Sequence, residues 1–174
     1  MTDSAQPAAS ETRAPAGFEI RPLVPADKAW VRGVLNRYWA SPRQVTRGKL
    51  RHADELPGFA AFRGEEAVGL ITYEIVGDEC EIITHNSLAD DGGIGSCLLA
   101  DLRTHARAQG CRRLWLVTSN DNTLAMKFYQ RRDFDMIAVH RDAIADNRKL
   151  KPEMPEVGMF GIRVKHEIEM EYSL

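Results

Sequence analysis

The feature that most constrains this chain is a glycine-rich turn, Asp90-Asp91-Gly92-Gly93-Ile94-Gly95-Ser96, which lies between a strand pattern and a helix pattern. The first backbone N–H groups of a helix have no intrahelical acceptors, and the helix dipole favours an anion there. Glycine lets such a backbone approach a phosphate closely, because it permits positive φ and carries no side chain. The turn therefore predicts a phosphate-binding site whose donors are the backbone N–H groups of residues 91–96.

The length of 174 residues favours one domain with its own hydrophobic core. Residues 1–17 are rich in Ala, Pro, Ser and Thr and have no apolar period, which predicts a flexible N-terminal tail. We therefore expect a single folded domain at 18–174.

Composition and charge narrow the functional classes. The formal net charge is −2 and the basic residues are dispersed, so we expect no nucleic-acid partner. No apolar run has the length of a membrane span and no secretory leader is visible, so we expect no membrane partner. Cys80, Cys97 and Cys111 lack the spacing of a zinc site or a disulfide framework. We expect reduced thiols in a cytoplasmic protein without a bound metal.

The apolar patterns predict a mixed α+β domain. Strand patterns cover 18–23, 59–63, 67–76, 79–84, 113–119, 134–140 and 167–172, and helical patterns cover 27–39, 94–109, 123–129 and 142–150. The strands between 59 and 84 are joined by short turns, so they must be antiparallel neighbours. The strands at 79–84 and 113–119 are joined by a helix, so they can lie parallel.

Two segments have less certain patterns. Residues 43–58 show no clear period, and we expect either substrate contacts or a plain connecting loop there. The acidic alternation at 167–172 is typical of an edge strand, which could either end the sheet or pair across a homodimer.

Two common phosphate-binding motifs do not match the turn. A nucleotide P-loop requires Lys after its last glycine, and Ser96 follows Gly95 here. A dinucleotide fingerprint requires a third glycine near Leu98 and an acidic residue after the second strand, and neither is present.

A second motif supports a different ligand. The span 79–134 resembles the GNAT superfamily of N-acetyltransferases, whose acetyl-CoA signature is [QR]-x-x-G-x-[GA] at a helix start. Gly93-Ile94-Gly95 matches its glycine part, and residues 122–129, NTLAMKFY, match the family's N-x-x-A-x-x-F-Y segment. Phe134 falls where the closing Gly-Phe pair ends. Residues 110–122, the Leu150-Lys151-Pro152 segment and the acidic final strand are similar to one bacterial subgroup whose substrates are largely unassigned.

This resemblance implies a GNAT-like fold, with a mostly antiparallel central sheet, flanking helices and a splayed strand pair at the cofactor site. It implies direct transfer of acetyl from acetyl-CoA to an amine, carried by a small molecule or a peptide, without a covalent enzyme intermediate. The glycine turn would bind the pyrophosphate, the splayed strand ends would bond the pantetheine arm, and Asn122 would either bind that arm or cap its own helix. The expected cofactor-binding residues are Thr84, His85, Asn86, Ser87, Asp91, Gly92, Gly93, Ile94, Gly95, Ser96, Thr118, Asn120, Asn122 and Tyr129.

Two residues are expected to be catalytic. Tyr129 matches the family tyrosine that protonates the departing thiolate, and its alternative is a core aromatic side chain. Glu81 is a candidate base for an amine that arrives as ammonium, and its alternative is a solvated carboxylate on a strand. His85 is a rival base with a near-neutral pKa or a structural residue at a strand end.

The chain departs from the family pattern at the site itself. Asp90 replaces Gln or Arg, Gly92 replaces a usually basic residue, and Asp133 stands where glycine normally precedes Phe134. Carboxylates at Asp90 and Asp91 would repel a pyrophosphate, by roughly 1–3 kcal/mol for each pair of unit charges at ~6 Å. A catalytically weak fold-mate that binds acyl-CoA as a sensor or interaction module is therefore the alternative. Acidic residues expected near the site, Glu79, Glu81 and Asp54, would suit a cationic amine.

Overall fold

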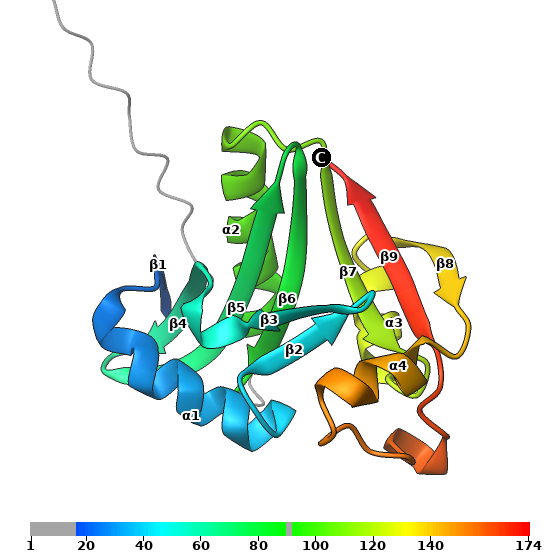
Figure 1. Ribbon diagram of the computed structural model, residues 1–174. Helices are drawn as coiled ribbons and strands as arrows, with labels where there is room; N and C mark the ends of the chain where they lie inside the picture. The colour runs from blue at the N-terminus through cyan, green and yellow to red at the C-terminus, as the bar shows by residue number, and fades with distance from the viewer. Residues whose placement is uncertain (1–16, 90–91) are drawn as a thin grey trace, which may run out of the picture.

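The computed structural model describes residues 17–89 and 92–174 and contains one seven-stranded sheet in the order β1-β4-β5-β6-β7-β9-β8 (Figure 1). A separate two-stranded sheet, β2-β3, lies beside it. The strands are β1 (Glu19–Pro22), β2 (Arg43–Thr46), β3 (Lys49–His52), β4 (Gly58–Arg63), β5 (Glu66–Val76), β6 (Glu79–Ser87), β7 (Arg113–Ser119), β8 (Asp135–His140) and β9 (Glu167–Ser173).

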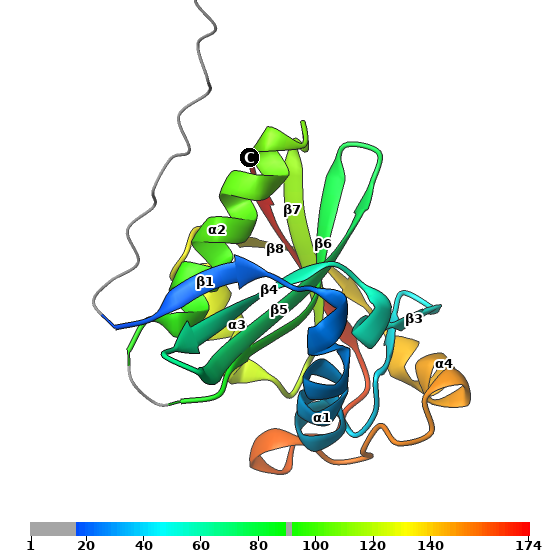
Figure 2. The ribbon, with the colours of Figure 1, turned by 90° about the vertical axis from the view of Figure 1, so that its left-hand side faces the viewer.

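Helices cover both faces of the central sheet, as the perpendicular view in Figure 2 shows. The α-helices are α1 (Lys28–Trp39), α2 (Ile94–Ala108), α3 (Thr123–Gln130) and α4 (Ala143–Leu150), and short 3-10 turns occupy η1 (Pro25–Asp27), η2 (Ala53–Glu55) and η3 (Met159–Gly161). One apolar cluster joins the sheet to α2 and α3, and a second joins the opposite face to α1. The α+β fold expected from the sequence is confirmed.

The sheet divides at β6 and β7. These strands are parallel, as expected, and their pairing runs only from Glu79 opposite Arg113 to Ile82 opposite Leu116. Beyond that point β6 pairs with β5 alone and β7 with β9 alone. The expected splayed pair is therefore present, and Figure 1 shows the two strands diverging toward their carboxyl ends.

The prediction that residues 167–172 form an edge strand is wrong. Strand β9 lies between β7 and β8, so β8 is the edge strand and β9 has no free edge for a homodimer. The acidic alternation suggested solvent exposure, but Glu167 and Glu169 are buried. Arg113 and His140 bind the Glu169 carboxylate, which makes an interior position possible.

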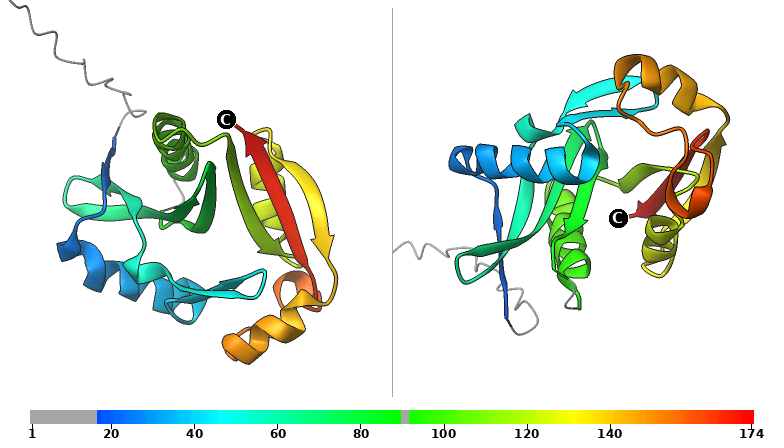
Figure 3. Two further views of the ribbon diagram at one scale, coloured as in Figure 1. Left: turned by 45° about the horizontal axis from the view of Figure 1, so that its top comes forward. Right: turned by 90° about the horizontal axis from the view of Figure 1, so that it is seen from below.

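Residues 43–58 are more regular than their sequence indicated. Strands β2 and β3 form a hairpin whose register places Thr46 opposite Lys49. Both turn residues have positive φ, 49° at Arg47 and 72° at Gly48, which is the two-residue hairpin turn that fits strand twist. The hairpin and α4 approach each other beside the open end of the β6–β7 pair (Figure 3).

The expected tail at residues 1–16 and the two aspartates, Asp90 and Asp91, lie outside the described residues. The expected role of Asp91 in pyrophosphate binding therefore stays a prediction. Asp133, which replaces the family glycine, adopts φ of 64°, so the backbone keeps the left-handed conformation that favours glycine.

Candidate active site

The described part of the glycine turn leads into an uncapped helix. Gly93 has φ of 110° and precedes the first residue of α2, and within residues 17–89 and 92–174 no side chain caps the helix there. The Cys97 N–H bonds the Gly93 carbonyl, 2.9 Å away, so the preceding N–H groups of Ile94, Gly95 and Ser96 have no intrahelical acceptor. This is the geometry expected of an anion site.

Gly95 is required for close packing at the same place. A Cβ built there would lie 3.1 Å from Ser87 Oγ, 3.3 Å from His85 Nε2 and 3.4 Å from the Phe128 ring. The absence of a side chain therefore brings the start of α2 against β6 and α3. The resulting small pocket, of about 200 Å³, is lined by His85, Ser87, Gly95, Leu124, Ala125, Phe128 and Tyr129.

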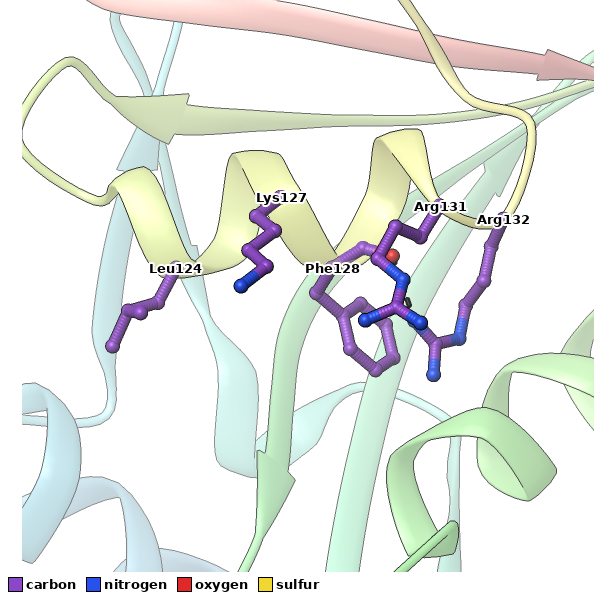
Figure 4. A pocket seen from close by; sticks show the side chains of 5 residues that line it. All are labelled: Leu124, Lys127, Phe128, Arg131 and Arg132. Carbon is purple, nitrogen blue, oxygen red and sulfur yellow. Dashed lines mark hydrogen bonds between the residues drawn. The ribbon is translucent and has the colours of Figure 1, made fainter.

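A larger, basic pocket of about 420 Å³ adjoins it along α3 (Figure 4). Its lining residues are Leu124, Lys127, Phe128, Arg131 and Arg132. The Arg132 guanidinium lies 3.6 Å from the Phe128 ring centroid and donates to Ser96 Oγ of α2. Within the described ranges, no ion pair engages Lys127 or Arg131. Two cations that form no ion pair with a described residue therefore line this pocket.

His85 and Tyr129 form a hydrogen-bonded pair at the wall of the small pocket. His85 Nε2 lies 3.0 Å from the Gly95 carbonyl, which can only accept, so Nε2 carries the proton. Nδ1 must then accept from the Tyr129 hydroxyl, 2.9 Å away. Burial lowers the pKa of His85 to about 4 and raises the pKa of Tyr129 well above its usual value. The histidine is therefore neutral and the tyrosine keeps its proton at physiological pH.

The remaining residues expected to bind cofactor have varied surroundings. The Thr84 hydroxyl is buried against Thr72, and Asn86 accepts from the Trp39 indole. Asn122 accepts from the Ala125 N–H at 3.1 Å, so capping, one of its two expected roles, is observed. Thr118 lines the cleft described next. The backbone N–H of Asn120 donates to the His166 carbonyl, and its side chain donates to the Arg163 carbonyl and accepts from the Lys165 and His166 N–H groups, so the backbone N–H is already engaged.

Glu81 is buried rather than solvated, being 3% exposed. Arg51 binds one of its carboxylate oxygens, and the Thr46 hydroxyl donates to the other at 2.7 Å. Burial raises the pKa of Glu81, while Thr46 and Arg51 act in the opposite direction. Because Thr46 lines the neighbouring cleft and Glu81 does not, the hydroxyl stands between the carboxylate and that cleft.

A third and larger cavity, of about 620 Å³, lies on the other side of the splayed strands from these two pockets. We call it the acceptor-side cleft. Its walls come from the end of α1, from β2, from Ile83 in the middle of β6, from the end of β7, from α4 and the segment that follows it, and from the first residue of β9. The polar members are Asn36, Arg37, Gln44, Thr46, Thr118, Ser119, Asp121, Asn122, Lys151, Glu153 and Glu167.

Sequence patterns did not identify most of this cleft. Of the acidic residues expected near the site, Asp54 and Glu79 do not line the cleft and pair with Arg32 and Arg113 instead, whereas Glu81 lies behind Thr46. Asp121, Glu153 and Glu167 line the cleft in their place. Lys151 was visible only within the Leu-Lys-Pro resemblance, and no motif indicated Gln44 or Glu167.

Among the described residues, no group of His, Cys, Asp or Glu has the arrangement of a metal site. Over the same ranges, no helix combines the length and apolar character that a bilayer span requires.

Comparison with known proteins gives a consistent picture. The model of the Acetyltransferase (GNAT) family matches residues 28–134. The uncharacterized protein YdhI of Bacillus subtilis is 41% identical over 133 residues, which cover 76% of this chain and 83% of YdhI. The uncharacterized protein YxbD of the same organism is 33% identical over 152 residues, which cover 87% of this chain and 96% of YxbD.

Solved structures share the fold at low sequence identity. A GNAT family acetyltransferase from Elizabethkingia anophelis, solved with acetyl-CoA bound, is 17% identical with a TM-score of 0.67, covering 92% of this chain and all of that chain. An IAA acetyltransferase from Bacillus cereus is 18% identical with a TM-score of 0.66, covering 90% of this chain and 99% of that chain. At such identities the likeness supports the fold alone.

Proposed function

Because the chain belongs to the GNAT acetyltransferase family, we propose that it transfers acetyl from acetyl-CoA directly to the amine of a small molecule or peptide. The single observation that carries this proposal is that Tyr129 and the start of α2, at Gly95, line the same small pocket. An anion site and a buried proton donor occur together there, on the side of the splayed strands opposite the acceptor-side cleft.

The residues present fit acetyl-CoA. The free N–H groups of Ile94, Gly95 and Ser96 would bind its pyrophosphate, and the basic pocket on α3 would hold its further phosphate. The unpaired ends of β6 and β7 would bond the pantetheine amides. When bound, the cosubstrate supplies an activated acetyl group as a thioester.

Tyr129 is the proposed acid. Its raised pKa keeps the hydroxyl protonated, and the O–H, which donates to His85 Nδ1 in the free chain, would turn toward the departing thiolate to deliver its proton. His85 is a positioning residue, because its Nδ1 holds the phenol and its Nε2–H is fixed by the Gly95 carbonyl. This fixed tautomer and the lowered pKa of the ring make His85 a poor base for the incoming amine.

Glu81 is the proposed base, acting through Thr46. The Thr46 hydroxyl donates to Glu81, accepts from Arg51 Nη1 and keeps one lone pair for a proton from the acceptor. As Thr46 takes a proton from the ammonium or amine, it passes its own proton to Glu81. The burial that raises the pKa of Glu81 makes this carboxylate a stronger base than a solvated one.

The test is thiol release from acetyl-CoA with a panel of amines, measured for the wild type, Tyr129→Phe, Glu81→Gln and Thr46→Val. We expect amine-dependent turnover in the wild type and a loss of kcat in each variant, while acetyl-CoA affinity is retained. Binding of acetyl-CoA without turnover of any amine would instead identify a sensor or interaction module.

A further inference from the structure

The charged residues of the acceptor-side cleft point to the chemistry of the acceptor. Lys151 follows α4 and is only 6% exposed, yet it lines the cleft. Its ammonium group donates to the neutral Gln44 side chain at 3.1 Å. Within residues 17–89 and 92–174 no carboxylate forms an ion pair with it. A buried cation with a neutral partner is costly unless an anion joins it.

The nearest candidate counter-ion is already engaged. Glu153 also lines the cleft, but its carboxylate pairs with Arg43 at 2.5 Å and hydrogen-bonds there. Burial lowers the pKa of Lys151 to about 8, which Glu153 only partly offsets and Arg43 reinforces. The ammonium therefore remains electrostatically unsatisfied, and a ligand anion in the cleft would restore the balance.

Negative charge lies on other walls of the acceptor-side cleft, at Asp121 and Glu167. Asp121 is 6% exposed, and one of its carboxylate oxygens accepts from the Met159 N–H at 3.0 Å. The other oxygen, Oδ1, is buried without a partner in the described part of the chain. Glu167 is 2% exposed and bonds the Asn147 side chain and the Arg47 N–H, both of which are neutral.

The cleft therefore holds buried charges of both signs, and in the described part of the chain no oppositely charged side chain forms an ion pair with Lys151, Asp121 or Glu167. A plain amine would satisfy only the acidic residues, and a plain acid would satisfy only Lys151. A zwitterion satisfies both, because its ammonium group is attracted to Asp121 and Glu167 before it loses a proton. The cavity volume of about 620 Å³ accommodates a small molecule of this kind.

We propose that the acceptor is a small amine that also carries an anionic oxygen group, and that Lys151 is the residue that binds this group. The inference rests on the proposed acetyl transfer and adds the substrate class to it. A carboxylate and a phosphonate share the required chemistry, so amino acids and aminoalkyl phosphonates are the two sources to separate.

The experiment compares matched amines in the thiol-release assay. L-leucine, L-lysine and L-phenylalanine are paired with isoamylamine, cadaverine and phenethylamine, and aminomethylphosphonate is paired with methylamine. We expect the wild type to prefer the anionic member of at least one pair by about 10-fold or more in kcat/KM. Preference for amino acids or for the phosphonate identifies the anion.

The variant Lys151→Met removes the cation and keeps an apolar stem, and Lys151→Gln provides a second, polar replacement. We expect either variant to raise KM for anionic acceptors about 10- to 100-fold, with KM for acetyl-CoA unchanged and the preference within each pair abolished. Lys151→Arg should recover part of the preference. Thermal denaturation of each variant separates this effect from a loss of folding.

The outcomes distinguish the two proposals. Equal turnover of anionic and plain amines, or a preference that survives both Lys151→Met and Lys151→Gln, would overturn the inference and leave acetyl transfer intact. Binding of acetyl-CoA without turnover of any member would overturn acetyl transfer to a small amine, and the inference with it.

Discussion

The two sides of the splayed strand pair differ in how the chain builds them. The cofactor side consists of neighbouring pieces of one continuous stretch, from β6 through α2 and β7 to α3. The acceptor side combines the end of α1, β2, the end of β7 with the turn before α3, and the segment after α4, so that Gln44 and Lys151 meet across 107 positions of sequence. Local motifs can specify the first side, whereas only the tertiary fold assembles the second.

Their electrostatics differ as well. The cofactor side has surface cations, Lys127 and Arg131, above an uncapped helix start, which suits the several phosphates of one ligand. The acceptor side buries Lys151, Asp121 and Glu167 with few charged partners. Surface cations change the affinity for a charged ligand and its dependence on salt, whereas unpaired buried charges discriminate sharply between ligands. We therefore expect substitutions on one side to change the binding of one substrate without changing the binding of the other.

Tyr129→Phe should have the largest effect, because the variant removes the proposed acid from the wall of the small pocket. We expect kcat to fall by about 10²-fold or more, the range for a lost acid–base group. Calorimetric affinity for acetyl-CoA should stay within twofold. Tyr172→Phe, on β9, is the matched control and should keep full activity. A normal kcat in Tyr129→Phe would contradict the proposed role of Tyr129 as the acid.

The double variant Lys127→Gln, Arg131→Gln tests the cofactor side. Loss of two phosphate-facing cations should raise KM for acetyl-CoA about 10-fold and weaken its dependence on ionic strength, with the acceptor KM unchanged. Initial-rate kinetics at two salt concentrations would measure this. The control removes two exposed cations elsewhere, Lys149→Gln and Arg112→Gln. If the control variant raised KM for acetyl-CoA as much, the cause would be the lower net charge of the protein rather than the loss of cations from this pocket.

His85→Gln should alter stability in acid. The folded chain holds the pKa of His85 near 4, against an ordinary value of 6.5, so between these values the unfolded chain binds more protons. Stability therefore falls as pH drops from 6.5 toward 4, with a slope approaching about 1.4 kcal/mol per pH unit from this residue. Urea denaturation across that window should show a shallower slope in the variant. Identical slopes would mean that the ring titrates normally in the folded protein.

Gly92→Arg tests the missing basic residue of the turn. Gly92 is exposed, and a Cβ added there would meet no atom within 4 Å, so the side chain fits. We expect acetyl-CoA to bind several-fold more tightly by calorimetry. Gly33→Arg on α1 is the control, since it also has open space and lies away from the pocket. Unchanged affinity in Gly92→Arg would count against the charge argument for this turn.

Asp133→Gly should have the smallest effect. A non-glycine residue in the left-handed conformation at φ of 64° carries strain, so glycine should stabilise the fold by about 1 kcal/mol or less. Urea denaturation would measure the gain. Asp135→Gly, on the neighbouring strand, should instead be destabilising. A loss of stability in Asp133→Gly would show that the Asp133 side chain stabilises the fold by more free energy than its left-handed backbone conformation costs.

The sequence predicted the fold, because the fold depends on short-range patterns: apolar periods identified the helices and the strands other than β2 and β3. The glycine turn and the 122–129 segment are short-range patterns as well, and the acetyl-CoA site that they indicate stays a prediction. The Asn122 cap was one of two expected roles and is observed in the hydrogen bond from Ala125, whereas cofactor binding by Asn122 stays a prediction. The conformation of Asp133 explains how the chain tolerates a non-glycine residue there.

The acceptor side could not be predicted in the same way. The β2–β3 hairpin carries little apolar alternation, because Gln44 and Arg51 are buried polar residues and Leu50 is exposed. The acidic pattern of the last strand suggested solvent exposure, because nothing local in the sequence shows that Arg113 and His140, distant along the chain, bind the buried Glu169. The Arg47-Gly48 pair was the one local signal available for the hairpin, since both positions need positive φ.

Two-substrate initial-rate kinetics on the wild type, Lys127→Gln with Arg131→Gln, Lys151→Met, and the three changes combined would test the central claim most directly. We expect the double variant Lys127→Gln, Arg131→Gln to raise only KM for acetyl-CoA, and Lys151→Met to raise only KM for the anionic acceptor. In the combined variant the two changes, expressed as free energies, should add within about 0.5 kcal/mol. An effect of Lys151→Met on KM for acetyl-CoA, with the acceptor KM unchanged, would contradict this claim.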